Sequence, residues 1–529
     1  MTMIHSILII LILILPIVHP LKVLFYAYAI AQSHISFHHT AMKLLLEQGH
    51  SVDVVIAVYN SAVKLKLPKE VGKNYTFGYE DPDYYSNKAT HLKAIFERRP
   101  IPWQEFAGFD DAALKLCKIA VNNDELLKFM KSEKYDIGIG NDYDPCGNIM
   151  FTAAGIPVTA SIVPTPLFQQ QVVSAGLPSL ASLYGTVLYP KSDDSFSDKL
   201  FHLLRHTYNI YVVQPSYSHK YNELTRSKFG ETFPDVDEIE RNIDVTFVNS
   251  NEIIEQPRPI SSKIKYIGGI GMRKTKPLTQ EFESILSLPS KGVVLFSFGT
   301  QVPTKLIPID IRNYFVEAFK QFPDYIFLWK YDSQTDNDND NSEGVDNIKR
   351  VQWLPQYDLL QDKRIKLFIS HMGLNSFIET ASSGVPVLSI PLFIDQQHNA
   401  QNAKSLDIGR IVNRDNITVY NLVSTLKELL GNQKYGENAK IVSNMMASKP
   451  EKAEKTYIEW VEYAAKNPGL HKVLNLPGAD QSPFYYYSGD IITTIIVIII
   501  TVLITISYLF HIILSKCRRS SNSSKLKIH

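Results

Sequence analysis

A strand-turn-helix-strand pattern between residues 353 and 396 constrains the fold more than any other stretch of the chain. The apolar run Leu367–Ile369 predicts a short buried strand, and the small and apolar residues from Leu374 to Ser383 predict a helix. Val387–Ile390 predicts the next strand. Two consecutive strands joined by a helix usually run parallel in one sheet. The stretch therefore predicts a domain of the α/β class.

Polar side chains stand where these two strands end. The turn between the first strand and the helix contains His371 and Gly373, and Glu379 lies about a turn and a half into the helix. Asp395 and Gln396 follow the second strand. Ligands of open α/β sheets bind at the carboxyl ends of the strands, and the free N–H groups of a helix N-terminus bind phosphate. We expect His371 to donate to a diphosphate and Glu379 to accept from ribose hydroxyls.

Other residues extend this expected nucleotide site. Trp353 offers a flat face for a base, and Gln356 offers an amide. A further strand at 293–298 runs into a turn that can donate to a phosphate. The complete expected donor-binding set is Ser297, Thr300, Trp353, Gln356, His371, Gly373, Asn375, Ser376, Glu379, Asp395 and Gln396.

The order and spacing of these motifs closely resemble the signature of the UDP-glycosyltransferases, specifically the membrane-bound UDP-glucuronosyltransferase group of animals. WLPQ-x-DLL, S-H-x-G, the helix glutamate, G-x-P and P-L-F-x-D-Q follow one another as in that family. Met372 is a departure, because many members have glycine there and glycine is free to adopt positive φ. The resemblance implies a GT-B fold, in which two Rossmann-like doubly wound domains face each other across a cleft.

The resemblance covers nearly the whole chain and sets the expected domain order. The expected parts are a signal peptide (1–20), an acceptor-binding domain (21–265), a linker (266–290), a UDP-sugar-binding domain (291–447), a helix with a juxtamembrane segment (448–490), a transmembrane helix (491–514) and a cytosolic tail (515–529). Lys22–Ala29, Ser36–Gln48 and Ser51–Val58 predict the first strand, helix and strand. We expect segments 60–115 and 165–235 to be irregular walls of an acceptor pocket, and the helix Glu451–Lys466 to pack on the first domain.

Two apolar segments indicate the compartment. Ile7–Val18 has the length of a signal-peptide core, whereas the uncharged run Ile491–Leu514 is long enough to cross a bilayer. Lys516 and two arginines follow that run, which predicts a cytosolic tail and a type I membrane protein. Lys525 and Lys527 resemble an endoplasmic-reticulum retrieval signal. We therefore expect a single-pass protein of the endoplasmic reticulum membrane with its catalytic part in the lumen.

Net charge and cysteine content limit the kinds of partner and cross-link that the chain can have. The formal net charge is +1, which gives no basis for nucleic-acid binding. Three cysteines are too few for a disulfide-built fold. Cys117 and Cys146 could pair in an oxidising lumen, but we favour two buried thiols. Asn74 and Asn416 begin glycosylation sequons.

The catalytic residues are inferred from the resemblance. The family base is a histidine in a short turn between the first strand and the first helix, and His34 stands there. The family also has an aspartate before a Pro-Cys pair, which orients that histidine. Alignment through Pro145-Cys146 puts Asn141 at this place, and we favour its neighbour Asp142. Asp142 and Asp144 also form a D-x-D motif that could hold a metal, but we expect no metal or other cofactor, because fixed donors already face the diphosphate.

The resemblance implies an inverting transferase that moves glucuronate or glucose from a UDP-sugar to a hydroxyl of a small lipophilic acceptor, a detoxification chemistry. Glucuronosyl members carry an arginine shortly before the P-R-P block, whereas this chain has Asn249 there, so glucose remains an alternative. A rival interpretation is a catalytically inactive, membrane-tethered UDP-sugar-binding protein, which Asn141 supports. The acceptor cannot be read from the sequence, and a homo- or hetero-oligomer remains open.

Overall fold

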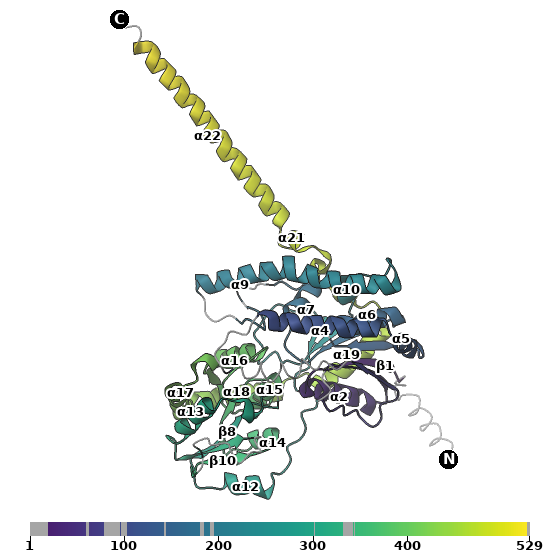
Figure 1. The fold of residues 1–529 in the computed structure, drawn as a ribbon, viewed down its shortest axis with the longest axis vertical. Coiled ribbons are helices and arrows are strands. Elements are labelled where there is room, and N and C mark those ends of the chain that lie inside the picture. The colour runs from purple at the N-terminus through teal and green to yellow at the C-terminus, as the bar shows by residue number, and fades with distance from the viewer. Residues whose placement is uncertain are drawn as a thin grey trace, which may run out of the picture. The chain divides into compact units, whose positions relative to one another are not determined.

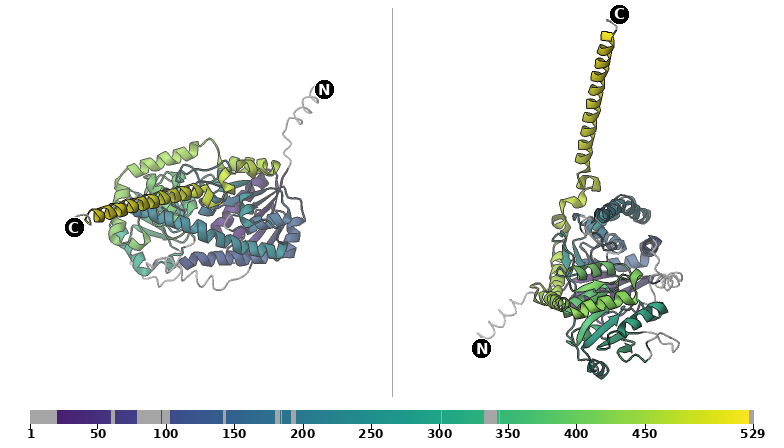
Figure 2. Two further views of the ribbon diagram at one scale, coloured as in Figure 1. Left: turned by 90° about the horizontal axis from the view of Figure 1, so that it is seen from above. Right: turned by 90° about the vertical axis from the view of Figure 1, so that its left-hand side faces the viewer.

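The structure is a computed structural model that describes residues 20–59, 63–78, 96, 103–141, 144–179, 183, 185–190, 195–300, 302–331, 342 and 344–525. Of the expected signal peptide, only Pro20 is among these residues. Asp142 and Lys527 lie outside them. The chain divides into two compact units, Met1–Asn475 and Leu476–His529. Unit 1 contains two parallel sheets in separate halves, as Figures 1 and 2 show.

The first sheet has seven parallel strands in the order β3-β2-β1-β4-β5-β6-β7. Its strands are β1 (Lys22–Ala29), β2 (Ser51–Val58), β3 (Asn74–Gly78), β4 (Ile137–Gly140), β5 (Thr159–Val163), β6 (Val245–Val248) and β7 (Ile264–Tyr266). The order reverses between β1 and β4, which is the doubly wound arrangement expected from the sequence. β1 and β2 are nearly continuous runs of buried apolar residues, as a parallel sheet with both faces covered requires.

Helices cover both faces of this sheet (Figure 1). They are α2 (Gln32–Glu47), α4 (Trp103–Val121), α5 (Asp124–Lys131), α6 (Cys146–Ala154), α7 (Gln169–Ser174), α9 (Phe196–Tyr208), a π-helical turn (Asn209–Val213), α10 (Gln214–Phe229), α11 (Val236–Arg241) and the late helices α19 (Ala453–Lys466) and α20 (His471–Leu474). α19 was expected to pack on this half, and Tyr457, Val461 and Ala464 are indeed buried in its core.

The expectation of irregular walls was wrong for part of 60–115 and for much of 165–235. α4 begins within the first segment, and α9, the π-helical turn and α10 form a continuous helical run in the second. Pro215 is accommodated because a π-helical turn directly precedes α10, and such turns relax the regular hydrogen-bond ladder. Tyr217 and Tyr221 of α10, two of the aromatic residues in this segment, lie one helical turn apart and pack against each other in the core.

The second sheet has six parallel strands in the order β10-β9-β8-β11-β12-β13. Its elements are β8 (Gly292–Ser297), β9 (Tyr325–Lys330), β10 (Ile348–Val351), β11 (Ile365–Ser370), β12 (Val387–Ser389) and β13 (Gly409–Ile411), with α12 (Gln280–Leu286), α13 (Ile309–Phe319), α14 (Gln356–Leu360), α15 (Leu374–Ser383), α16 (Gln396–Ser405), α17 (Val419–Gly431), α18 (Lys434–Ser448) and short 3-10 turns at Thr304–Leu306 and Arg414–Asn416. The predicted helix Leu374–Ser383 is confirmed. β10 ends at Val351, two residues before Trp353.

Aromatic side chains fill the core between β8, β9 and α13. Phe296 stacks on Trp329 at a centroid distance of 4.9 Å, and Phe319 stacks on Phe327 at 3.9 Å. Aromatic pairs of this kind contribute about 0.5–1.5 kcal/mol each beyond their buried area. This packing fixes the strands whose carboxyl ends carry the candidate site.

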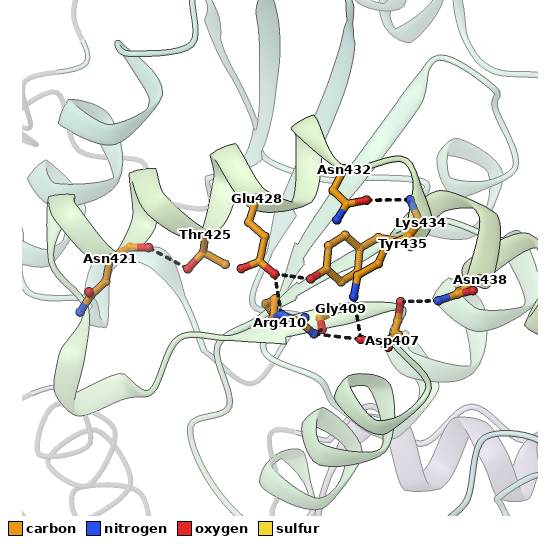
Figure 3. A network of polar contacts seen from close by, with 10 residues as sticks. All are labelled: Asp407, Gly409, Arg410, Asn421, Thr425, Glu428, Asn432, Lys434, Tyr435 and Asn438. Carbon is orange, nitrogen blue, oxygen red and sulfur yellow. Dashed lines mark hydrogen bonds and ion pairs between the residues drawn. The ribbon is translucent and has the colours of Figure 1, made fainter.

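A polar network secures the edge strand β13 to α17 and α18 (Figure 3). Arg410 Nε donates to Glu428 Oε1 at 2.8 Å, and the Tyr435 hydroxyl donates to the same carboxylate. On the other side, Arg410 Nη1 donates to Asp407 Oδ1 at 3.2 Å. Burial and the Glu428 carboxylate raise the pKa of Tyr435 to about 12, so the phenol stays a donor at neutral pH. The network therefore fixes the edge strand β13 against α17 and α18.

The connection between the halves passes through a glycine-rich turn. Gly269 and Gly271 both have positive φ, and a Cβ at Gly271 would lie 2.2 Å from Thr40 Cγ2 of α2. Only glycine fits this approach and this conformation. Arg273, just beyond the turn, forms an ion pair with Asp358 of α14. The connection is thus held against both halves.

Cys117 and Cys146 are joined as a disulfide between α4 and α6, with their Cα atoms 5.4 Å apart. The expectation of two free thiols was therefore wrong. The sequence separation of 29 residues gave no indication that α4 and α6 would pack side by side. Disulfides persist in oxidising compartments.

Unit 2 contains a 3-10 turn (Pro477–Asp480), α21 (Pro483–Tyr486) and α22 (Gly489–Lys525). Within α22, Gly489–Cys517 is long and apolar enough to cross a membrane, and this part of the helix is not buried against the protein. The expected membrane span, Ile491–Leu514, lies inside it.

Candidate functional site

His371 stands between two glycines in the turn after β11. A Cβ at Gly299 would lie 2.7 Å from His371 Cε1, and a Cβ at Gly373 would lie 2.7 Å from His371 Nε2. Both positions must therefore be glycine for the ring to fit, and Gly299 also has φ of +72°. Burial lowers the pKa of His371 to about 4, and the Lys330 ammonium lowers it too. The imidazole is neutral at pH 7, with one ring nitrogen able to donate.

The next residue, Met372, has the positive φ that favours glycine. Its φ is +66°, and its side chain is fully buried beside α15 and α16. Its N–H donates to Ser370 Oγ at 3.1 Å, and its carbonyl accepts from Asn399 Nδ2 at 3.0 Å. These contacts offset a strain of about 1–3 kcal/mol. The departure from the family pattern therefore keeps the shape of the turn.

Glu379 lies one and a half turns along α15, where Gln356 of α14 meets it. Gln356 Nε2 donates to Glu379 Oε2 at 2.7 Å and to Ser376 Oγ at 3.1 Å. Burial raises the pKa of Glu379, while the Gln356 hydrogen bond and Arg273 lower it. The structure thus brings together three residues that the sequence had placed in one site.

Asp395 and Gln396 lie at the start of α16. Asn399 Nδ2 donates to Asp395 Oδ2 at 2.9 Å, and burial raises the pKa of Asp395 to about 6. The amide oxygen of Gln396 accepts from the backbone N–H groups of Leu392 and Phe393. Gln396 therefore braces the loop between β12 and α16.

The ends of β8, β9 and β10 meet at the same edge of the sheet. Ser297 Oγ accepts from the Gly299 N–H at 3.1 Å, which fixes the turn before the exposed Thr300. Trp353 is 66% exposed, as a stacking surface must be. Lys330 was not predicted, yet its Nζ donates to the Gly299 carbonyl at 2.7 Å and lies 6.0 Å from the centre of the Trp353 ring. The one sequence feature that indicated a role for Lys330 in the site was its position at the end of a predicted strand.

Two contacts cross from the first half to the second beside this edge. Asn249, which follows β6, donates from Nδ2 to Asn375 Oδ1 at 3.1 Å, at the start of α15. Glu255 Oε1 lies 2.5 Å from His398 Nε2 of α16, and both side chains are buried. Burial raises the pKa of Glu255, but His398 and neighbouring donors lower it more, to about 2. The carboxylate is therefore charged where the two halves meet.

On the first sheet, His34 lies in the first turn of α2. This corrects the expectation of a turn before the helix, because α2 begins at Gln32 without a side-chain cap. The ring is half-buried, and burial lowers its pKa to about 4. One helical turn later, His38 is fully buried, and burial together with His34 lowers its pKa to about 3. Both rings are neutral at pH 7.

The candidate partners of His34 follow β4, which is hydrogen-bonded to β1 in the sheet. Asn141 is 3% exposed at the end of β4, so it lies on the same edge as the β1–α2 connection. Asp142 is outside the described residues. Asp144 accepts from the Cys146 N–H at 2.7 Å at the start of α6, which gives this carboxylate a structural role. Across the described ranges, no group of three or more His, Cys, Asp or Glu residues could hold a metal ion.

Comparisons with known proteins agree with this arrangement. The family described as "UDP-glucoronosyl and UDP-glucosyl transferase" matches residues 22–523. UDP-glucuronosyltransferase 2B1 of Rattus norvegicus is 26% identical over 91% of each chain, and UDP-glucosyltransferase 2 of Dactylopius coccus is 29% identical over 58% of each chain. The crystal structure of the glycosyltransferase of kitacinnamycin has the same fold, with a TM-score of 0.59 and 14% identity over 85% of this chain and 100% of that one. The chain therefore belongs to the UDP-glucuronosyl and UDP-glucosyl transferase family and is a GT-B enzyme that transfers sugar from a UDP-sugar.

Proposed function

We propose that this enzyme transfers glucuronate or glucose, with inversion, to a hydroxyl group of a small lipophilic acceptor. The observation that carries the proposal is the carboxyl edge of the second sheet. At this edge stand a neutral imidazole (His371), an ammonium group (Lys330), the start of α15 and, further along α15, a carboxylate (Glu379). This combination suits an anionic diphosphate joined to a ribose.

Each donor residue has a role that follows from its surroundings. The diphosphate would bind His371 and the N–H groups at Gly373, Asn375 and Ser376, with Thr300 donating from the other side. An anion beside His371 stabilises imidazolium, so binding would raise its low pKa. The base would stack on Trp353, and Glu379, already oriented by Gln356, would accept from the ribose hydroxyls. Asp395 would contact the sugar, held in place by Asn399 and by the loop that Gln396 braces.

His34 would act as the general base. The acceptor oxygen attacks the anomeric carbon while the bond to the UDP oxygen breaks, and the acceptor proton moves to the imidazole. A ring whose pKa is lowered to about 4 by burial is unprotonated at neutral pH and ready to accept it. A carboxylate from Asp142 would orient the ring and stabilise imidazolium, or the amide of Asn141 would orient it less effectively.

The donor sugar depends on the residue at position 249. Asn249 donates to Asn375 at the start of α15, where an arginine of glucuronosyl members is expected to meet the sugar carboxylate. A neutral amide gives a carboxylate no ion pair, which favours UDP-glucose. Relatives of both kinds, a glucuronosyltransferase and a glucosyltransferase, match this chain.

The same proposal includes the setting of the reaction. The leaving diphosphate is neutralised by fixed donors without a metal or other cofactor. α22 anchors the chain as a single-pass type I protein of the endoplasmic reticulum membrane, with both sheets in the lumen, where a disulfide is stable. Lipophilic acceptors dissolve in that membrane, which suits a detoxifying glycosyltransferase.

The proposal is tested with microsomes that contain the full chain. UDP-glucose and UDP-glucuronate are each supplied with a panel of phenols, and glycoside formation is measured. We expect turnover with at least one donor and an anomeric configuration opposite to that of the donor. UDP binding without turnover for any acceptor would instead support the inactive UDP-sugar-binding protein that Asn141 suggests.

A further inference from the structure

Helix α9 and the π-helical turn after it carry apolar side chains toward solvent and histidines toward the protein. Phe196 is 81% exposed and Leu204 is 61% exposed, whereas His202 is only 3% exposed. The exposed apolar set includes Phe196, Leu200, Leu203, Leu204, Tyr208 and Tyr211, which we call the α9 apolar face. A helix on the surface of a soluble domain has the opposite arrangement.

Helical spacing places this set on one side. Apart from the adjacent pair Leu203 and Leu204, the six residues recur every three or four positions, so they share one broad face over about 15 residues, or roughly 23 Å of helix. His202 and His206 lie on the opposite side and have polar partners there. His206 Nδ1 lies 3.3 Å from Ser179 Oγ, and His202 Nε2 lies 3.6 Å from Asp198 Oδ2. The polar side of α9 is therefore the one that packs on the protein.

An exposed apolar face of this length marks an interaction surface. Helices that lie in the plane of a membrane surface have one such face of Phe, Leu and aromatic residues, with cations at its borders. Lys199 and Arg205 occupy the borders of the α9 apolar face by helical spacing. Tyr208 and Tyr211 add rings that favour the boundary between lipid and water.

The chain itself attaches unit 1 to a helix that is long and apolar enough to cross a bilayer. Residues 476–488 connect unit 1 to the apolar helix α22, and 13 extended residues span at most about 45 Å. Part of this connection is helical and therefore shorter. Phe484, Tyr485 and Tyr487 are exposed directly before α22, as an aromatic belt at a membrane surface would be. A domain tethered to a membrane-spanning helix has a high effective concentration at the lipid surface, so even a weak lipid contact is occupied.

We propose that the α9 apolar face lies in the phospholipid interface and forms a second membrane contact of this protein, apart from α22. Residues from Phe196 to Tyr211 would insert to the depth of the headgroup and acyl boundary, with the helix axis parallel to the membrane. This contact does not depend on which sugar or acceptor the enzyme uses.

Depth-dependent quenching in nanodiscs of phosphatidylcholine tests this proposal with the full chain. Cys517 is replaced by serine, which leaves the Cys117–Cys146 pair as the remaining cysteines. Single cysteines are introduced as Phe196→Cys, Leu204→Cys or Tyr211→Cys and labelled with a small fluorophore. Tyr487→Cys before the membrane span is the positive reference. Tyr420→Cys on α17, 79% exposed in the other half of unit 1, is the aqueous control.

We expect nitroxide groups on the lipid acyl chains to quench the three α9 labels as strongly as the label at position 487. Aqueous iodide should quench the label at position 420 instead. Lipid quenching at α9 no stronger than at position 420 would overturn the proposal. Protection of the α9 labels from both quenchers would also overturn it, because it would show a protein, such as a second copy of this chain, covering the face.

Discussion

The two halves of unit 1 have the same type of sheet but differ in how their candidate sites are built. In the second half, His371, Gly373 and Glu379 come from one turn and one helix, so their relation is fixed by local geometry. In the first half, His34 follows β1, and its candidate partners follow β4, more than 100 residues later. The comparison teaches that the relative positions of candidate residues close in sequence can be predicted from sequence, whereas those of candidate residues brought together by the fold cannot.

The largest effect should come from the acceptor side, where one residue carries the proposed chemistry. His34→Ala should lower kcat by about 10²–10⁴-fold, because proton acceptance by a positioned base contributes that much. UDP affinity should stay unchanged, since the donor site lies on the other sheet. Turnover with saturating UDP-sugar and titration of UDP measure the two quantities. His39→Ala is the matched control, because its ring contacts only the Lys66 carbonyl among the described polar groups.

The pH profile gives an independent check on His34. Burial lowers its pKa to about 4, so the base loses activity only as pH falls toward that value. The folded pKa lies below the ordinary value near 6.5, so the unfolded chain binds more protons between the two values, and stability rises with pH across this window. We expect kcat/KM to be flat from about pH 5.5 to 7 and to fall below about pH 5. A fall centred near about pH 6.5 would indicate a different, more exposed base.

The contact between the halves should show the next largest effect, on stability. Glu255→Gln removes the charge opposite His398 inside the protein, and breaking a buried pair costs about 3–5 kcal/mol. Glu252→Gln in the same loop is the control. The Glu252 carboxylate is partly exposed and pairs with Lys449, and exposed pairs of this kind contribute at most about 1 kcal/mol. Chemical or thermal unfolding measures the free energy of unfolding of both variants. Equal stabilities would show that the two halves are joined by other contacts.

This pair also predicts how acid affects the protein. The folded pKa of Glu255, about 2, lies below its ordinary value of 4.5. Its contribution to stability is therefore present above about pH 4.5 and is lost as pH falls toward 2. The Glu255→Gln variant should lack this part of the acid dependence.

Much of the fold was predictable because its strands are apolar runs of the right length. Lys22–Ala29, Ser51–Val58 and the helix Leu374–Ser383 have the predicted bounds. The α9–α10 region was mispredicted because its apolar residues face outward and its prolines and aromatics imitate a loop. The disulfide and Lys330 were missed since both depend on which elements become neighbours. Local structure could therefore be predicted from the sequence, whereas contacts between distant elements could not.

On the donor side, Glu379→Ala should weaken UDP binding by about 2–4 kcal/mol, since two charge-assisted hydrogen bonds to the ribose are lost. These contacts are remote from the anomeric carbon, so KM should rise more than kcat falls. Glu317→Ala on α13 is the control, because that carboxylate is exposed and pairs with Lys320. Unchanged UDP affinity in Glu379→Ala would show that the ribose does not bind Glu379 of α15. It would contradict the predicted donor site of the second half.

A smaller effect is expected where the halves meet the sugar. Asn249→Arg adds a cation beside the start of α15, so it should raise the preference for UDP-glucuronate over UDP-glucose by about tenfold, or about 1.4 kcal/mol. The ratio of kcat/KM for the two donors measures this preference. Asn249→Gln, which adds length without charge, should leave the ratio unchanged. An unchanged ratio in the arginine variant would place the donor sugar away from this contact.

The smallest expected effect is that of metal removal. Activity should stay within about twofold of its starting value in EDTA, because Lys330, His371 and the dipole of α15 already neutralise the leaving diphosphate. Asp142-x-Asp144 is the acidic motif considered for this role, and Asp144 already accepts from the start of α6. Loss of activity that manganese or magnesium restores would turn that motif into a metal site. Residues of the first half would then help to bind the diphosphate, and the distinction between a donor-binding half and an acceptor-binding half would be wrong.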